Sequence, residues 1–184
     1  MRRVKGSIML DFVKVVHRAR HLPWDRYLTA QDFELVESMI LPSSWYPLET
    51  YQRIGLAVYE LLGQGRPENA RRWGQESMAR LMEGVYQKAL LKGDPLEAIK
   101  SFITLRKTLI DFGEFALNPI GPGQVEFIMF EVNEIPGLEP FSHMFVGNME
   151  KLAAANGGRE VTVEFSDQRR NDRPARVFQI RWRP

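Results

Sequence analysis

The chain has 184 residues, of which 44% are hydrophobic and 26% charged, and its formal net charge at pH 7 is +2. These values are ordinary for a globular protein, and so small a charge does not point to nucleic acid, so any basic site must be local. The absence of cysteine excludes disulfides, thiolate nucleophiles and cysteine-ligated zinc, and it favours a cytoplasmic location. No apolar run reaches the roughly 18 residues that a membrane span requires.

The first two thirds of the sequence have the residue spacing of amphipathic helices. Residues 5–20 place their apolar side chains on one helical face, and Pro23 ends this pattern. Thr29 and Asp32 have the spacing of a capping box, which predicts a short second helix directly after them.

The stretch L-P-S-S-W-Y-P-L-E-T-Y (41–51) places two adjacent aromatic residues just before a third helix. Ser44 is expected as the N-cap of this helix and Pro47 as part of its first turn. Trp45 and Tyr46 then have two interpretations: they pack back on the helix and fix its direction, or they form a surface for a protein partner. We expect a split, in which Trp45 is the buried anchor and Tyr46 points outward.

The pattern changes from helical to alternating at Gly113. Before this point, Pro67 and Pro95 suit the first turns of two further long helices. After it, the predicted elements are strands at 115–117 and 125–130, a helix at 138–156, and strands at 161–165 and 178–182. The wholly polar residues 166–174 are predicted to form a mobile loop between the last two strands.

This order of elements predicts an α+β fold. An N-terminal helical layer packs on a C-terminal four-stranded antiparallel sheet, whose elements follow the order β-β-α-β-β. We expect the chain to form a single domain over 1–184, with a helical subregion at 1–112 and a sheet-containing subregion at 113–184.

The residues that could carry catalysis form no persuasive constellation. His17 and His21 lie one helical turn apart, but a metal site needs a further ligand, and the neighbouring arginines would repel a cation. His143 follows a serine on a helix, where adjacent side chains point in different directions. Glu126 and Glu131 fall on opposite faces of a strand, with Glu134 nearby. We therefore expect no enzyme activity and no bound metal.

The C-terminal arginines form the alternative candidate site. Arg181 and Arg183 share one strand face, opposite the apolar residues of that strand. The expected anion patch consists of Arg169, Arg170, Arg173, Arg181 and Arg183. The segment R-R-N-D-R has the Arg-x-x-x-Arg spacing of cyclic-dinucleotide readers, but the motif that should follow it is missing. Solvated charges along a sheet edge are the other interpretation, and nucleic acid is not the expected partner.

Several segments, taken in order, resemble a known family. They are K-G-S-I-M-L-D-F-V (5–13), a helical first half, and F-Q-I-R-W-R-P (178–184) at the end. Over nearly the whole chain they resemble the haem–nitric oxide/oxygen-binding (H-NOX) domains. The wider superfamily includes 4-vinyl-reductase-like sensor domains and Golgi-transport subunits. L-P-S-S-W-Y-P-L-E-T-Y and L-L-K-G-D-P-L-E-A-I look more specifically like a paralogous family expanded in myxobacteria.

The resemblance does not carry over the haem site of that family. The axial histidine of H-NOX domains lies on the helix before the sheet, which here is 95–112 and contains no His, Cys, Met or Tyr. The Tyr-x-Ser-x-Arg motif that holds the haem propionates corresponds to F-E-V-N-E (130–134). We therefore expect this chain to bind no haem and no other cofactor.

The resemblance implies an apolar interior between helices and sheet, which in relatives holds haem or an acyl chain. Here this interior is either a filled core or a pocket. The residues expected to form it are Phe102, Phe127, Met129, Phe141, Met144 and Phe145. The implied function is a non-enzymatic sensor-like or adaptor module that acts through a protein partner or as a homodimer, gated by an apolar small molecule. The alternative is an anion- or nucleic-acid-binding module that uses the arginine cluster.

Overall fold

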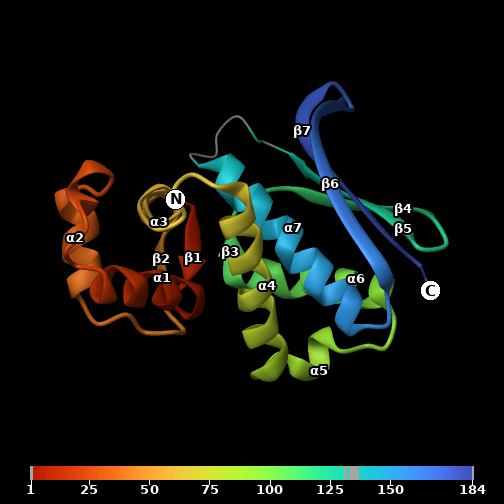
Figure 1. The fold of residues 1–184 in the computed structure, drawn as a ribbon, viewed down its shortest axis with the longest axis horizontal. Coiled ribbons are helices and arrows are strands. Elements are labelled where there is room, and N and C mark those ends of the chain that lie inside the picture. The colour runs from red at the N-terminus through yellow and green to blue at the C-terminus, as the bar shows by residue number, and fades with distance from the viewer. Residues whose placement is uncertain (1, 131, 133–136, 184) are drawn as a thin grey trace.

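The computed structural model of the chain describes residues 2–130, 132 and 137–183. Its elements form an N-terminal unit and a C-terminal unit, which lie at the left and right of Figure 1. The N-terminal unit contains β1 (Arg3–Lys5), α1 (Gly6–Arg18), η1 (Trp24–Arg26), α2 (Ala30–Glu37), β2 (Trp45–Pro47) and α3 (Leu48–Leu61). The C-terminal unit contains α4 (Pro67–Glu83), α5 (Gln87–Leu90), α6 (Pro95–Leu109), β4 (Phe115–Gly121), β5 (Gln124–Phe130), α7 (Leu138–Ala155), β6 (Arg159–Arg170) and β7 (Arg173–Arg183).

The C-terminal strands form the predicted four-stranded antiparallel sheet. Its strand order is β4-β5-β7-β6, and α7 is inserted between β5 and β6, so the β-β-α-β-β order is confirmed. Phe127 of β5 pairs with Phe178 of β7, which pairs in turn with Phe165 of β6. Because paired residues point to the same face of a sheet, these rings form one apolar surface beneath the helices. The α+β fold class is therefore confirmed.

The helices α4 and α7 cross at two glycines that bring their backbones into close contact. A Cβ atom on Gly74 would lie 1.9 Å from the carbonyl oxygen of Met144, and one on Gly147 would lie 1.9 Å from that of Arg71. No side chain larger than hydrogen fits at either position. The crossing holds α4 against α7, which with α6 covers the inner face of the sheet.

A second, smaller sheet was not predicted from the sequence. Its order is β2-β1-β3, where β3 is Ile110–Asp111, and all its pairs are antiparallel. Val4 is its centre, paired with Tyr46 on one side and Ile110 on the other. These strands are two or three residues long, too short to show an alternating pattern. The first helix accordingly begins at Gly6, because the residues before it belong to this sheet.

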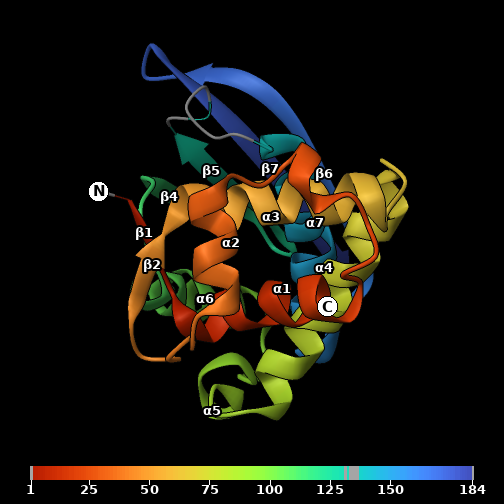
Figure 2. The same ribbon diagram turned by 90° about the vertical axis from the view of Figure 1, so that its left-hand side faces the viewer.

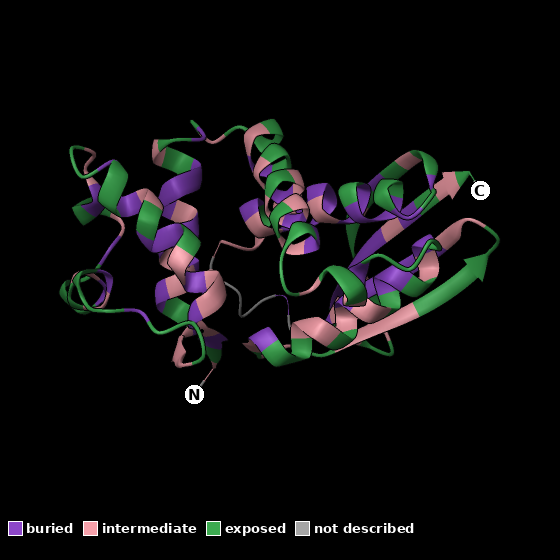
Figure 3. Cartoon of the chain, turned by 90° about the horizontal axis from the view of Figure 1, so that it is seen from below, coloured by how far each residue is buried: buried purple, intermediate pink, exposed green. Residues whose placement is uncertain are grey.

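The two units have separate apolar cores. One core joins α1, α2 and α3, and the other joins α4, α6 and α7 to the sheet. Seen from the side of the N-terminal unit (Figure 2), α1, α2 and α3 lie in front of α4 and α7. The cores therefore divide between α3 and α4, whereas the expected subregions divide at residue 112, where helix gives way to strand. Figure 3 shows buried residues along the helices of both units.

The prediction of a mobile loop at 166–174 is wrong. β6 and β7 continue through these residues and are joined by a tight turn at Asn171 and Asp172, whose φ angles are 50° and 58°. Two consecutive residues with positive φ are typical of the type I′ hairpin turn, which asparagine and aspartate tolerate better than most residues. The polar composition reflects an exposed hairpin rather than a loop.

No helix in the described part of the chain is long and apolar enough to cross a membrane.

Candidate ligand cavity

A cavity of about 170 Å³ lies where the two units meet. Five of the six residues expected in the apolar interior line it: Phe102, Met129, Phe141, Met144 and Phe145. Phe127 does not line it, because this residue is fully buried in the sheet core with its ring centroid 4.6 Å from that of Phe145. The cavity is also lined by Ile8 of α1, Leu48 and Tyr51 of α3, and Ser77 and Leu81 of α4.

The helix α7 supplies one wall of the cavity through one of its faces. Phe141, Met144, Phe145 and Asn148 are spaced at three and four residues, so they project on the same side. The ring of Phe141 reaches across to the N-terminal unit, where Gly55 of α3 leaves room for it. A Cβ atom on Gly55 would lie 2.5 Å from this ring. The cavity is therefore bounded by side chains that also join the two units.

Arg106 of α6 is the charged residue in this mostly apolar wall. Its guanidinium lies 3.7 Å from the ring centroid of Phe115, and Nη1 donates a hydrogen bond of 3.3 Å to the carbonyl oxygen of Phe112. Burial lowers the pKa of Arg106 to about 10, so the group stays positively charged at neutral pH. Sequence reasoning missed this residue, although Phe102, Arg106 and Leu109 have helical spacing and show one cation within an apolar stripe.

Two further polar groups line the cavity. Burial, with a smaller contribution from Asp11, raises the pKa of the Tyr51 phenol, so the hydroxyl remains protonated and can donate a hydrogen bond. The Oδ1 atom of Asn148 is buried and makes no hydrogen bond within the described residues. A buried amide oxygen without a donor is unfavourable by about 1–3 kcal/mol.

A second hollow of about 590 Å³ lies between α1, α3 and α4 and adjoins the first. The two share lining residues from all these helices and from α7: Ile8, Tyr51, Ser77, Leu81 and Met144. An ion pair of 3.5 Å between Asp11 of α1 and Arg80 of α4 links two of its walls.

The expected orientation of Trp45 and Tyr46 is reversed in the structure. Tyr46 pairs with the fully buried Val4 and packs against the N-terminal core, and its hydroxyl accepts a hydrogen bond of 2.7 Å from the Leu41 N–H. Trp45 lies on the other face of β2, with Lys5 Nζ 4.2 Å from its ring centroid. Strand alternation explains the reversal, because residues 45–47 form β2 and adjacent side chains point to opposite faces.

The start of α3 also differs from its prediction. The helix begins at Leu48 with Pro47 as its N-cap, and Ser44 makes no capping hydrogen bond. Instead the Ser44 carbonyl accepts from the Gly6 N–H at 2.9 Å, which ties the preceding turn to α1. The stretch 41–51 thus contains a three-residue edge strand, β2, that leads directly into α3.

The five candidate arginines do not form one continuous patch. Arg169, Arg170 and Arg173 lie near the hairpin tip, whereas Arg181 and Arg183 lie towards the other end of β7. Eight residues separate Arg173 from Arg181, which corresponds to about 26 Å along a strand. The set is thus divided into two groups.

Most of these arginines also have acidic partners. The pairs are Arg170 with Glu126 at 3.0 Å, Arg173 with Glu114 at 2.9 Å, Arg181 with Glu164 at 3.5 Å and Arg183 with Glu160 at 2.7 Å. Arg169 donates to the backbone carbonyl of Asp172. A set of arginines divided in space and balanced by carboxylates offers little free positive charge to an anion.

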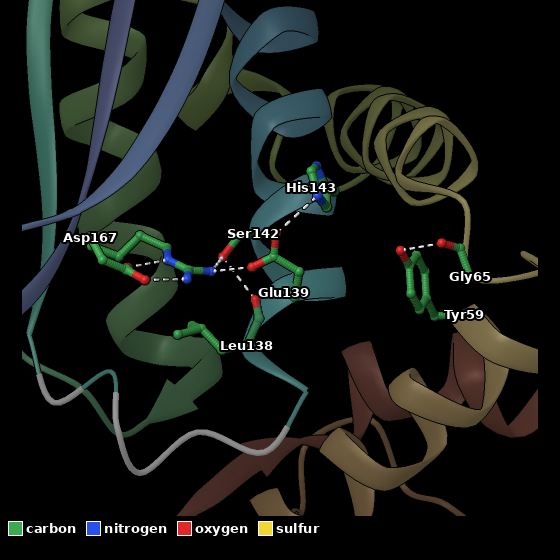
Figure 4. A network of polar contacts seen from close by, with 8 residues as sticks. Tyr59, Gly65, Leu138, Glu139, Ser142, His143 and Asp167 are labelled. Carbon is green, nitrogen blue, oxygen red and sulfur yellow. Dashed lines mark hydrogen bonds and ion pairs between the residues drawn. The ribbon is translucent and has the colours of Figure 1, made fainter.

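A buried arginine that the sequence analysis did not single out links the sheet to α7. Arg176 donates to both carboxylate oxygens of Asp167 at 2.8 Å, and its Nη1 donates to Glu139 at 2.9 Å and to Ser142 at 2.8 Å. Its guanidinium lowers the pKa of the Asp167 carboxyl below its usual value. Figure 4 shows Asp167, Glu139 and Ser142 converging at the start of α7, with His143 beside them. This network fixes where the cavity-lining helix begins.

Two of the three histidines have structural contacts, and His21 lies in an exposed turn after the end of α1 rather than on the helix with His17. His17 Nε2 lies 3.0 Å from the carbonyl oxygen of Val36, and His143 Nε2 lies 3.3 Å from Glu139. Glu126 is buried beside Arg170, and Glu131 and Glu134 lie outside the described residues. Within the described part of the chain, no group of three or more His, Asp or Glu side chains could hold a metal ion.

Comparison with solved structures identifies similar folds among H-NOX proteins. A mutant of the T. tengcongensis H-NOX matches with a TM-score of 0.64 and 14% identity, over 98% of both chains. An Fe(II) unliganded mutant H-NOX protein from K. algicida gives 0.63 and 14%, over 98% of this chain and 97% of that one. An oxygen-binding H-NOX domain related to soluble guanylate cyclases, in its oxygen complex, gives 0.61 and 14%, over 98% and 95%.

The sequence itself matches no family model and no curated protein. At 14% identity the structural matches show the fold, and the chain has an H-NOX-like fold over almost its entire length. The predicted resemblance is confirmed at this level.

Proposed function

We propose that this chain, which has an H-NOX-like fold, is a non-enzymatic sensor or adaptor domain that binds a small, largely apolar molecule without haem. Ligand occupancy would change the contact between its two units and so its affinity for a protein partner or a second copy. A cytoplasmic setting and a single domain over 1–184 are part of this proposal.

The position of the cavity is the observation that carries the proposal. Its lining comes from α1 and α3 of the N-terminal unit and from α4, α6, α7 and β5 of the C-terminal unit. A molecule in this space contacts both units at once. A ligand shifts the equilibrium between two arrangements of the units towards the arrangement that it binds more tightly. A molecule that contacts both units therefore favours one arrangement over the other. That is the physical requirement of a sensor.

The residues around the cavity do not fit a haem. On α6, which corresponds to the axial-ligand helix of the family, the lining side chains are Phe102, Arg106 and Leu109, and none of these ligates iron. Met129, Met144 and Tyr51 offer potential ligand atoms from other elements. The cavity itself, at about 170 Å³, is nevertheless below the ~300 Å³ at which drug-sized ligand pockets begin. A porphyrin would also have to occupy the adjoining hollow, two of whose walls the Asp11–Arg80 ion pair joins. We therefore assign no haem chemistry to this chain.

Mass spectrometry of the purified protein tests the proposal. Small molecules extracted from the wild type would be compared with those from Leu81→Phe, which fills the cavity, and from Leu91→Phe, which changes an exposed residue. We expect the wild type and Leu91→Phe to retain the same compound and Leu81→Phe to lose most of it. Equal retention by all three variants, or no specific compound in the wild type, would contradict small-molecule binding at this site.

A haem titration completes the test. The protein should be colourless as purified, and added haem should bind no better than nonspecifically. A sharp Soret band after reconstitution that one substitution at Met129, Met144 or Tyr51 abolishes would overturn the proposal of a haem-free site.

A further inference from the structure

The electrostatic setting of Arg106 sets it apart from comparable arginines in the protein. Arg53, Arg170 and Arg176 are also partly or fully buried, and each has a carboxylate oxygen within 3.0 Å. Arg106 has no carboxylate within ion-pair distance among the described residues, and the titratable group that acts on it electrostatically is the phenol of Tyr51, which stays neutral at pH 7. A positive charge in an apolar wall is costly unless an anion compensates it. Among the residues that the structure describes, no carboxylate compensates the charge of Arg106 in the cavity wall.

The contacts that Arg106 does make orient it and leave donors free. One face of its guanidinium stacks on Phe115, and one N–H donates to the Phe112 carbonyl. A guanidinium has five N–H donors in a rigid plane, and Arg106 makes one hydrogen bond to an acceptor among the described residues. This planar arrangement matches the two oxygens of a carboxylate, which it binds through parallel hydrogen bonds.

The rest of the cavity suits a small apolar group. Phe102, Phe141, Phe145 and Met129 form its walls. An engineered protein cavity of about 150 Å³ holds benzene, so a space of about 170 Å³ accommodates a body of roughly six to eight carbon atoms. Tyr51 supplies a hydroxyl donor in the same wall, where it can assist in binding an acceptor oxygen.

We propose that the cavity binds a small organic acid, with a monocyclic aromatic or short aliphatic body, whose carboxylate pairs with Arg106. This inference rests on the proposed function, because it names the chemical class of that function's ligand. The apolar walls hold the body of the acid, and the carboxylate supplies the negative charge that the described surroundings of Arg106 lack.

Binding measurements on four probes test the inference. Phenylacetate and hexanoate represent the two kinds of body, and phenylacetamide and hexanamide are their neutral counterparts. Calorimetry and the ligand-induced rise in melting temperature would be compared for the wild type, Arg106→Met and Arg72→Met, the last a control at an exposed arginine of α4. Arg106→Met keeps an unbranched apolar side chain and removes the charge.

We expect at least one acid to bind the wild type and Arg72→Met with similar affinity. The affinity of Arg106→Met for the same acid should be lower by a factor of about ten or more. The corresponding neutral amide should bind the wild type and Arg106→Met alike. The acid that binds better identifies the body as aromatic or aliphatic. Because no carboxylate pair is broken, Arg106→Met should melt at a temperature no lower than the wild type. If it does not fold, Arg106→Lys, which keeps the charge but loses the planar fork, should bind the acid more weakly than the wild type.

The inference is wrong if neither acid binds the wild type, or if Arg106→Met binds both as well as the wild type does. These results are distinct from failure of the proposed function. A neutral compound that is retained by the wild type and lost from Leu81→Phe would leave the function intact and exclude the acid.

Discussion

The ring of Phe141 on α7 stacks on the ring of Tyr51 on α3, with centroids 5.4 Å apart and planes inclined by 24°. The Phe12 ring of α1 completes this group at 4.9 Å from Tyr51. The group joins the N-terminal core to the helix that forms the cavity wall. Tyr51 and Phe141 also line the cavity, so this group of rings lies where the cavity meets the contact between the units.

Phe141→Ala should separate the unfolding of the two units. The substitution removes a half-buried ring from their contact, so we expect a loss of about 2–3 kcal/mol and a broadened or two-step urea transition. Phe33→Ala, which removes a half-buried ring of α2 away from the cavity, should lower stability without splitting the transition. Circular dichroism and tryptophan fluorescence would follow both variants. Coincident single transitions for Phe141→Ala would show that the ring does not couple the units.

Gly74→Ala should disrupt the crossing of α4 and α7. The added methyl group would lie 1.9 Å from the Met144 carbonyl oxygen, so the helices must move apart, at a cost of about 3 kcal/mol or more. Gly121→Ala is the matched control, because no atom lies within 4 Å of its Cβ position. Thermal melts would compare the two variants. A Gly74→Ala protein as stable as Gly121→Ala would exclude the close helix crossing.

Tyr46→Ala should be more destabilising than Trp45→Ala. Tyr46 packs on the N-terminal core and accepts a hydrogen bond, so its truncation should cost about 2–3 kcal/mol. Trp45 contacts mainly the cations of Arg3 and Lys5 on the outer face, so its truncation should cost about 1 kcal/mol or less. Denaturant melts give both values, and sedimentation shows whether Trp45→Ala weakens self-association. A larger stability loss for Trp45→Ala would restore the original expectation.

Asp32 makes folding stability depend on pH in the acid range. Burial raises the pKa of this fully buried carboxyl, but hydrogen bonds from Arg53, Thr50 and Thr29 outweigh that effect and hold the pKa well below its usual range. A carboxyl whose folded-state pKa is depressed contributes stability above its unfolded pKa of about 3.9, and this contribution is lost as the pH falls towards the folded-state pKa.

Asp32→Asn should therefore cost about 2–3 kcal/mol at pH 7 and 5, and progressively less below pH 4. The exposed Asp25→Asn is the control and should change little at any of these values. Urea midpoints at pH 7, 5, 4 and 3 provide the measurement. A gap between the wild type and Asp32→Asn that stays constant down to pH 3 would argue against the depressed pKa.

Arg170→Ala should destabilise the sheet more than Arg169→Ala. Removing Arg170 leaves the buried carboxylate of Glu126 with Asn118 as its one remaining side-chain partner among the described residues, at a cost of about 1–3 kcal/mol. Arg169 is exposed, and its loss should change stability by no more than about 0.5 kcal/mol. The double variant Arg170→Ala/Glu126→Gln should recover part of the loss in chemical melts. Equal effects of the two single variants would mean that the ion pair contributes nothing.

The sequence predicted the long elements and one of the two named caps. Thr29 with Asp32 forms the expected capping box, whereas Ser44 does not cap α3. α6 begins at Pro95 as expected, and Asp94 accepts a 2.8 Å hydrogen bond from the Glu97 N–H there. These features succeed because capping depends on residues only three positions apart. The amphipathic helix at 138–156 was also predicted within one residue of its end.

Features that depend on distant pairing were missed. A three-residue strand such as β1 has no periodicity of its own, and only its partners at 45–47 and 110–111 define it. The orientation of Trp45 and Tyr46 was wrong for this reason. Arg106 was overlooked because adjacent residues in the sequence do not show which carboxylates lie near its side chain in the fold. The arginines near the hairpin tip were assigned to a loop because composition alone does not distinguish a polar hairpin from a polar loop.

The small sheet has a consequence for how the chain folds as it is synthesised. Arg3 and Asp111 pair across 108 positions, with side chains 2.5 Å apart. At translation rates of roughly 5–20 residues per second, the last strand leaves the ribosome about 5–20 s after the first. During that interval β1 has one open edge, which can pair with another nascent chain. Slower translation over the first hundred codons should therefore prolong the period in which the emerging polypeptide depends on chaperones.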